Sequence, residues 1–167
     1  MLQSAGDHAE ANAVLHATAT QLLPGFRGAL YIFNNSRDRL ALSTHWGLND
    51  DEVPTESISL QKCWALKRGK PHMNVPGSHR LCCEYHAFSA SALEIPMIAR
   101  GEILGLLHIY CDGADSDVQL AEVASIGSAM ADAMSLALSN LALRDKLRSQ
   151  ATRCMFHRGP NRTNLKR

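Results

Sequence analysis

The sequence predicts an α+β fold, in which an antiparallel sheet of five or six strands carries helices on one face and ends in a long C-terminal helix. Two pairs of apolar, strand-forming runs are each joined by a short turn, which is the pattern of two β-hairpins. A proline-free stretch from Ser116 to about Arg153 has apolar residues at helical spacing. A chain of 167 residues suits one such domain with one core.

The N-terminal third predicts a helix followed by the first hairpin. Apolar residues recur at helical spacing in Asp7–Leu23, where Asp7 is available as a cap, and Pro24 follows the helix. Alternating side chains then predict strands over Phe26–Phe33 and Leu40–Trp46.

The middle of the chain is richer in loops. Residues 47–57 are polar and predict a loop, and Ser59 is a suitable N-cap for a short helix over Leu60–Arg68. Gly69 lies where a helix-ending glycine is favoured, and His72–Val75 predicts a brief strand.

The second hairpin combines the strands Ser91–Ala99 and Ile103–Tyr110 around a tight turn. Pro96 removes one ladder donor, which indicates an edge or a bulge. The second strand is a largely apolar run and suits a central position buried on both faces. Gly105 within it indicates close approach by another element.

The long C-terminal helix would measure about 55 Å at about 1.5 Å per residue, more than a domain of this size can cover. We therefore expect Asn140–Arg153 to project. Leucines between its charged residues predict a two-helix coiled coil in a homodimer, and the alternative is a terminal helix that frays in solvent.

Composition narrows the function classes. A net charge of +1 and an aromatic content of 5% give no reason to expect nucleic acid as a partner. We find neither a run of about 20 apolar residues nor a secretory signal, so we expect a cytoplasmic protein that does not enter a membrane. Five unevenly placed cysteines favour free thiols or metal ligands over a disulfide framework.

The second hairpin, EIPMIARGEILGLLHIY, resembles the signature of a GAF domain. The matching positions are Pro96, Met97, Gly101, Leu104, Gly105 and Leu107. The order of predicted elements agrees, and the resemblance covers about residues 7–140. It implies a sensory domain that binds a small molecule between the sheet and a cover, which on this chain would be Leu60–Phe88.

The stretch CWALKRGKPH, followed by a cysteine and a histidine, resembles GAF domains that lie just upstream of GGDEF domains, which make cyclic di-GMP. Residues 1–140 would form the sensory domain, 141–153 a signalling linker helix, and 154–167 a disordered tail that is a remnant or altered start of a missing output domain. In that tail only Asn161-Arg162 matches a GGDEF start, and the GGDEF catalytic residues are absent from this chain. We therefore do not expect it to be an enzyme.

The predicted cover is rich in thiols and imidazoles. Candidate ligand-binding residues are Cys63, His72, Cys82, Cys83 and His86, with His79 and Glu84 as further polar groups. The Cys83-x-x-His86 pair together with Cys63 and His72 makes a candidate tetrahedral zinc set of two thiolates and two imidazoles. Two other interpretations stay open. The residues can serve only in packing, or the thiols can be redox-active, with Cys63 a better partner than the strained vicinal pair Cys82-Cys83.

These observations lead to three functional hypotheses. The first is a regulatory module of a cyclic di-GMP-type signalling protein, which senses a ligand, a metal or redox state and transmits through its C-terminal helix in a homodimer. The second is a thiol enzyme, because free methionine sulfoxide reductases are small GAF proteins with cysteines on the cover loops. The third is a ligand-free dimerisation module. A bilin chromophore is disfavoured because no Cys-His dipeptide is present.

Overall fold

The computed structural model describes residues 2–34, 36–49, 52, 54–78, 81–85 and 90–156. The helical elements are α1 (Leu2–Leu22), the single 3-10 turn η1 (Leu60–Lys62), α2 (Trp64–Arg68) and α3 (Ser116–Phe156). The strands are β1 (Arg27–Phe33), β2 (Arg39–Trp46), β3 (Ser57–Ser59), β4 (His72–Asn74), β5 (Ser91–Ala99) and β6 (Glu102–Cys111).

The six strands form one sheet in the order β3-β2-β1-β6-β5-β4, and every neighbouring pair is antiparallel. The two predicted hairpins, β1-β2 and β5-β6, are confirmed, and β1 pairs with β6 to join them. The short strand β4 extends one edge, as predicted. At the other edge β3 pairs with β2 inside a region that was predicted as loop and cap.

The β5-β6 hairpin has the geometry that its sequence demands. Arg100 and Gly101 both have positive φ, 54° and 78°, which is the conformation of a two-residue type I′ turn. The β5 ladder shifts register between Met97 and Ile98, one residue after Pro96. A Cβ atom on Gly105 would lie 2.3 Å from the Tyr31 carbonyl oxygen and from the Met97 Cε, so the predicted close approach is present.

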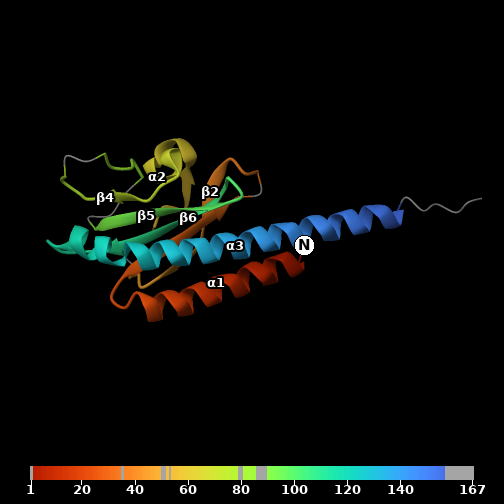
Figure 1. Ribbon diagram of the computed structural model, residues 1–167, viewed down its shortest axis with the longest axis horizontal. Coiled ribbons are helices and arrows are strands. Elements are labelled where there is room, and N and C mark those ends of the chain that lie inside the picture. Colours follow the sequence, from red (N-terminus) through yellow and green to blue (C-terminus); the bar gives the residue numbers. More distant parts are fainter. Residues whose placement is uncertain are drawn as a thin grey trace, which may run out of the picture.

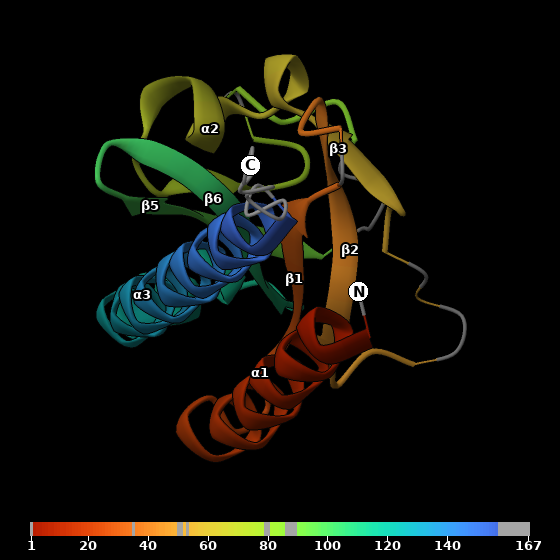
Figure 2. The same cartoon turned by 90° about the vertical axis from the view of Figure 1, so that its right-hand side faces the viewer.

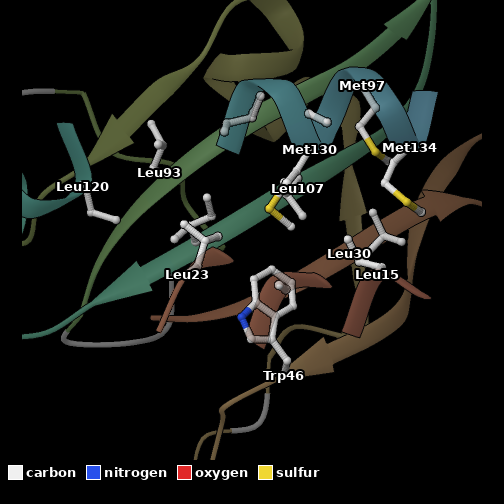
Figure 3. Close-up of a cluster of buried hydrophobic side chains, with 14 of the residues drawn as sticks. Leu15, Leu23, Leu30, Trp46, Leu93, Met97, Leu107, Leu120, Met130 and Met134 are labelled. Carbon is white, nitrogen blue, oxygen red and sulfur yellow. The ribbon is translucent and has the colours of Figure 1, made fainter. Parts of the chain in front are cut away.

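Two layers cover the sheet. The long helices α1 and α3 run side by side on one face, and the segment that includes η1 and α2 covers the other (Figures 1 and 2). The core between the sheet and the long helices contains Leu30, Trp46, Leu107, Met130 and Met134, shown in Figure 3. A second core, built around Tyr31, Leu40, Ile58, Leu66 and Leu106, lies beneath η1 and α2.

Two helix predictions need correction. The helix α1 begins at Leu2. Asp7 therefore lies within it and is not its cap. The predicted Leu60–Arg68 helix is divided, because the backbone of Cys63 is extended, with φ −111° and ψ 119°, between η1 and α2. Gly69 ends α2 in the left-handed conformation, as predicted.

The C-terminal helix α3 has 41 residues, a length of about 60 Å. Its C-terminal part runs beyond the sheet and beyond α1 (Figure 1), and residues 142–152 are almost all exposed. Residues 154–156 continue α3, whereas the rest of the predicted disordered tail lies outside the described residues. In the described part of the chain, Ser116–Thr152 is the one helical segment long and apolar enough to cross a membrane, with a mean hydropathy of 1.3.

Candidate functional site

Three ionisable side chains meet inside the second core, on the sheet face opposite α1 and α3. They are Cys63, Cys83 and Glu94, which are at most 3% exposed, and their ligand atoms all lie within 4.8 Å of one another. Burial of such groups is costly unless they are hydrogen-bonded, protonated or bound to a metal ion. This cluster is the candidate functional site.

The site is built from three separate elements. Cys63 lies at the break between η1 and α2, where its extended backbone takes it out of both helical turns. Glu94 belongs to β5 and faces the second core, while its neighbours Leu93 and Ile95 face the long helices. Cys83 lies on the loop that returns from β4, and its backbone N–H donates to the Asn74 Oδ1 at 2.8 Å.

The two carboxylate oxygens of Glu94 have different partners. Its Oε1 accepts hydrogen bonds from the Asn74 amide at 2.6 Å and from the Tyr85 hydroxyl at 2.7 Å. Its Oε2 lies 3.1 Å from the Cys83 Sγ and 3.5 Å from the Cys63 Sγ. The carboxylate is thus oriented with one oxygen anchored and the other directed at both thiols.

Hydrogen bonding divides the protons unequally between the two thiols. A hydrogen bond from the Cys63 thiol, helped by the Trp64 backbone N–H at 3.2 Å, lowers the pKa of Cys83 to about 5. The same hydrogen bond, together with burial, raises the pKa of Cys63. Burial raises the pKa of Glu94 to about 8. At neutral pH the three groups therefore hold about two protons and one negative charge, which favours Cys83 as the thiolate.

Aromatic side chains from the sheet form the floor of the site. The His108 ring stacks on Tyr85 with a centroid distance of 5.9 Å, and its Nδ1 lies 2.8 Å from the Tyr110 hydroxyl. Its Nε2 lies 3.8 Å from the Glu94 Oε1. Burial raises the pKa of Tyr31 to about 12, so this hydroxyl stays protonated. The floor therefore supplies hydroxyl donors and one imidazole to a water-poor site.

Of the residues predicted as metal ligands, the structure brings Cys63 and Cys83 together. The Nε2 of His72 lies 2.8 Å from the Leu81 carbonyl oxygen, a contact that ties β4 to the following loop. Cys82 is exposed, with its Sγ 3.7 Å from the Val75 carbonyl oxygen. His79 and His86 lie outside the described residues. Glu84 is at the surface, 3.0 Å from Lys62.

Sequence reasoning missed Glu94, Asn74 and Tyr85. Glu94 was assigned only to a strand, yet a glutamate between Leu93 and Ile95 in an apolar strand is itself a signal, since glutamate is rarely buried unless paired. Cys111, in contrast, lies outside the site as a small buried residue at the end of β6, and its Sγ lies 3.1 Å from the Gln119 Oε1 on α3. None of the four described cysteines, Cys63, Cys82, Cys83 and Cys111, is in a disulfide.

Comparison with solved structures identifies the fold. The GAF domain/HD domain protein from Geobacter sulfurreducens aligns with a TM-score of 0.64 at 20% identity, over 82% of this chain and 95% of that one. A type II free methionine-R-sulfoxide reductase from Thermoplasma acidophilum aligns with a TM-score of 0.59 at 19% identity, over 81% and 96%. A domain of a two-component sensor histidine kinase from Sinorhizobium meliloti aligns with a TM-score of 0.58 at 15% identity, over 84% and 96%.

This chain therefore has the fold of GAF domains, and its structural neighbours include domains of sensor kinases and other signalling proteins. No family model and no curated protein matches its sequence.

Proposed function

We propose that this chain is a cytoplasmic regulatory module whose input is the Cys63–Cys83–Glu94 site and whose output is α3. The observation that carries the proposal is the double role of β5. On one face of this strand Glu94 holds both thiols, and on the other face Leu93 and Ile95 pack in the core that includes α3. A structural change in the site can therefore reach α3 through the single strand β5.

The contact between the sheet and α3 is tight at Gly127. A Cβ atom there would lie 2.7 Å from the Ile95 Cδ1 and 2.6 Å from the Ile109 Cδ1. Ile109 follows His108, the imidazole on the floor of the site. Close-packed contacts of this kind transmit small shifts because interiors have few voids to absorb them. This packing supports α3 as the element that responds.

The proposed assembly is a homodimer in which α3 pairs with its copy. An exposed stripe on α3 has the alternating spacing of three and four residues that a coiled coil requires. It consists of Ile126, Ala129, Ala133, Leu136, Asn140, Leu143 and Leu147. We call this set the α3 stripe. Three of its leucines are 41–63% exposed, which is unusual for large apolar side chains that have no partner.

The α3 stripe also borders an apolar groove of about 500 Å³ between α1 and α3, lined in part by Val14, Leu22 and Ile126. A second copy would cover both surfaces. In such a dimer the apolar residues of α3 pack on the sheet and on the second copy, which favours an assembly without membrane or nucleic-acid partners.

The output we propose is a cyclic di-GMP-type enzyme domain that follows α3. The support is the sequence resemblance of the Cys63–His72 stretch to GAF domains that lie upstream of GGDEF domains. The test is to join a GGDEF domain after Arg153 and to measure cyclic di-GMP production. Glu94→Gln should change the activity, and the exposed Cys82→Ser should not. Equal activity in all three proteins would refute the regulatory role.

A thiol reductase is the second candidate, favoured by the low pKa of Cys83 beside a second thiol and by the fold shared with the Thermoplasma acidophilum reductase. The Cys83 thiolate would take the oxygen of free methionine sulfoxide and become a sulfenate. Cys63 would then form a disulfide with release of water, and an external dithiol would reduce it.

Incubation with free methionine-R-sulfoxide and dithiothreitol tests this candidate. We expect no methionine to form, because Cys63 and Cys83 are buried under η1, α2 and the 81–85 loop. Turnover that disappears in Cys83→Ser and persists in Cys82→Ser would establish the reductase in place of the regulatory module.

A further inference from the structure

The input site has the composition of a metal centre. Cys63 and Cys83 each offer a sulfur atom and Glu94 offers a carboxylate oxygen, and all three are buried. Thiolate ligands select zinc and copper(I), whereas a carboxylate is a hard ligand that suits a divalent ion. The combination of two thiolates and one carboxylate therefore favours Zn²⁺.

The distances between the ligand atoms fit a tetrahedral ion. With Zn–S near 2.3 Å and Zn–O near 2.0 Å, a tetrahedron has edges of about 3.5 Å between sulfur and oxygen and about 3.8 Å between the sulfurs. The Glu94 Oε2 lies 3.5 Å from the Cys63 Sγ and 3.1 Å from the Cys83 Sγ. The two sulfurs lie within 4.8 Å of each other. Shifts of a few tenths of an ångström would admit the ion.

The surrounding hydrogen bonds are those that hold metal ligands in place. Asn74 and Tyr85 anchor the Oε1 of Glu94 and leave its Oε2 for the ion. The Trp64 backbone N–H donates to the Cys83 Sγ at 3.2 Å, which stabilises a thiolate. Asn74 also accepts the Cys83 backbone N–H, so one amide positions two of the three ligands. Removing such an outer partner typically weakens metal affinity by about 10- to 100-fold.

The charge balance also suits a divalent cation. Without a metal ion, the two cysteines and Glu94 together hold about two protons and one negative charge. Zn²⁺ bound to two thiolates and the carboxylate carries the same net charge, because the ion replaces two protons that leave to solvent. Metal binding therefore adds no net charge to a buried site, which would otherwise be costly.

We propose that Cys63, Cys83 and Glu94 bind one Zn²⁺ ion, with the fourth tetrahedral position left to water or to an incoming ligand. This ligand set replaces the imidazole of His72, which is bonded to the Leu81 carbonyl oxygen, with the carboxylate of Glu94. The inference rests on the proposed function only in naming this site as the input.

Wild-type protein is first purified without chelator, and its zinc content per chain is measured by elemental mass spectrometry. The metal-free protein is then titrated with Zn²⁺ against a chromophoric chelator. We expect one Zn²⁺ per chain. Cys83→Ser and Glu94→Gln should weaken binding at least 100-fold, and Tyr85→Phe should weaken it about 10- to 100-fold. Cys82→Ser is the matched control, since it removes the adjacent exposed thiol, and should bind as the wild type does.

Cobalt(II) gives a readout that does not depend on a variant folding. Wild-type protein loaded with Co²⁺ should show a thiolate-to-cobalt charge-transfer band and the intense visible bands of a tetrahedral ion. Absence of the thiolate band, equal loss of affinity in Cys82→Ser, or a zinc-free protein that cannot be loaded would each overturn the proposal. So would isolation of the wild type with a Cys63–Cys83 disulfide that reforms in the presence of Zn²⁺.

Failure of the metal site and failure of the regulatory role are separable. Zinc stoichiometry and the cobalt spectrum report on the site alone, whereas transmission is measured on α3. A protein that binds no zinc but whose α3 responds to peroxide would overturn this inference and leave the regulatory module standing.

Discussion

Glu94 shows how a single residue can define a site. Its side chain is fully buried in a strand whose neighbours are apolar, a position that is costly for a carboxylate unless its oxygens are satisfied. The Glu94 oxygens are hydrogen-bonded by side chains from three different segments, namely Asn74, Tyr85 and the two thiols. Removing Glu94 therefore leaves several buried polar groups without their shared partner, and the loop that carries Cys83 and Tyr85 depends on it.

Two glycines allow a test of packing at the residue scale. Gly105→Ala would place a Cβ 2.3 Å from the Tyr31 backbone carbonyl, which cannot yield without moving β1. We expect a loss of about 1–3 kcal/mol or more in the free energy of unfolding, measured by urea denaturation. At Gly127 the obstructing atoms are the flexible ends of Ile95 and Ile109.

The matched variant Gly127→Ala should therefore cost less. Alanine gains about 1 kcal/mol over glycine in a helix, which offsets displacement of the two isoleucine ends. We expect its stability to lie within about 1 kcal/mol of the wild type. A Gly105→Ala protein as stable as Gly127→Ala would contradict the close approach of β1 to β6 at Gly105.

Among the elements, α3 carries two surfaces with different roles. Leu120, Met130 and Leu138 face the sheet and are buried. The α3 stripe lies on another face, and its spacing continues from the part of the helix beside α1 into the projecting part. Asn140 occupies a core position of the repeat, where a polar side chain selects register and a two-stranded assembly at some cost in stability.

The α3 stripe predicts the effect of a charge on assembly. If the chain forms the proposed homodimer, Leu136→Lys should convert it to a monomer in sedimentation velocity, because the lysine would bury a charge between the two helices. Leu81→Lys is the control, since Leu81 is equally exposed, 62% against 63%, but lies on the 81–85 loop. A wild-type monomer, or a Leu136→Lys protein that remains dimeric, would contradict dimerisation through α3.

At the scale of the whole molecule, local patterns predicted most of the fold. Both hairpins, the Arg100-Gly101 turn and the long helix follow from alternation, glycine placement and helical period. The edge strand β3 was not predicted, because its existence depends on pairing with β2. The break at Cys63 was also invisible, because Leu60–Arg68 has good helical composition and tertiary packing overrides it.

The site was predicted only in part, because tertiary packing also decides which side chains meet there. Cys63 and Cys83 stood out as chemistry-bearing residues near each other in the chain. Glu94 and Asn74 joined them only through the antiparallel pairing of β4 with β5, in which Asn74 lies opposite Ala92 and His72 opposite Glu94. This pairing brings Asn74 within hydrogen-bonding distance of Glu94, and no spacing along the chain reveals it.

The proposed connection of the thiol site to α3 through β5 can be measured by hydrogen exchange of the α3 amides between Gly127 and Thr152. Exchange is measured in wild-type protein alone, with Zn²⁺ and with hydrogen peroxide, and in Glu94→Gln with the same additions. We expect Zn²⁺ or oxidation to change protection along this segment in the wild type, and Glu94→Gln to lose the response to Zn²⁺. Identical α3 exchange in all states, with occupancy or oxidation of the site verified by mass, would contradict this connection.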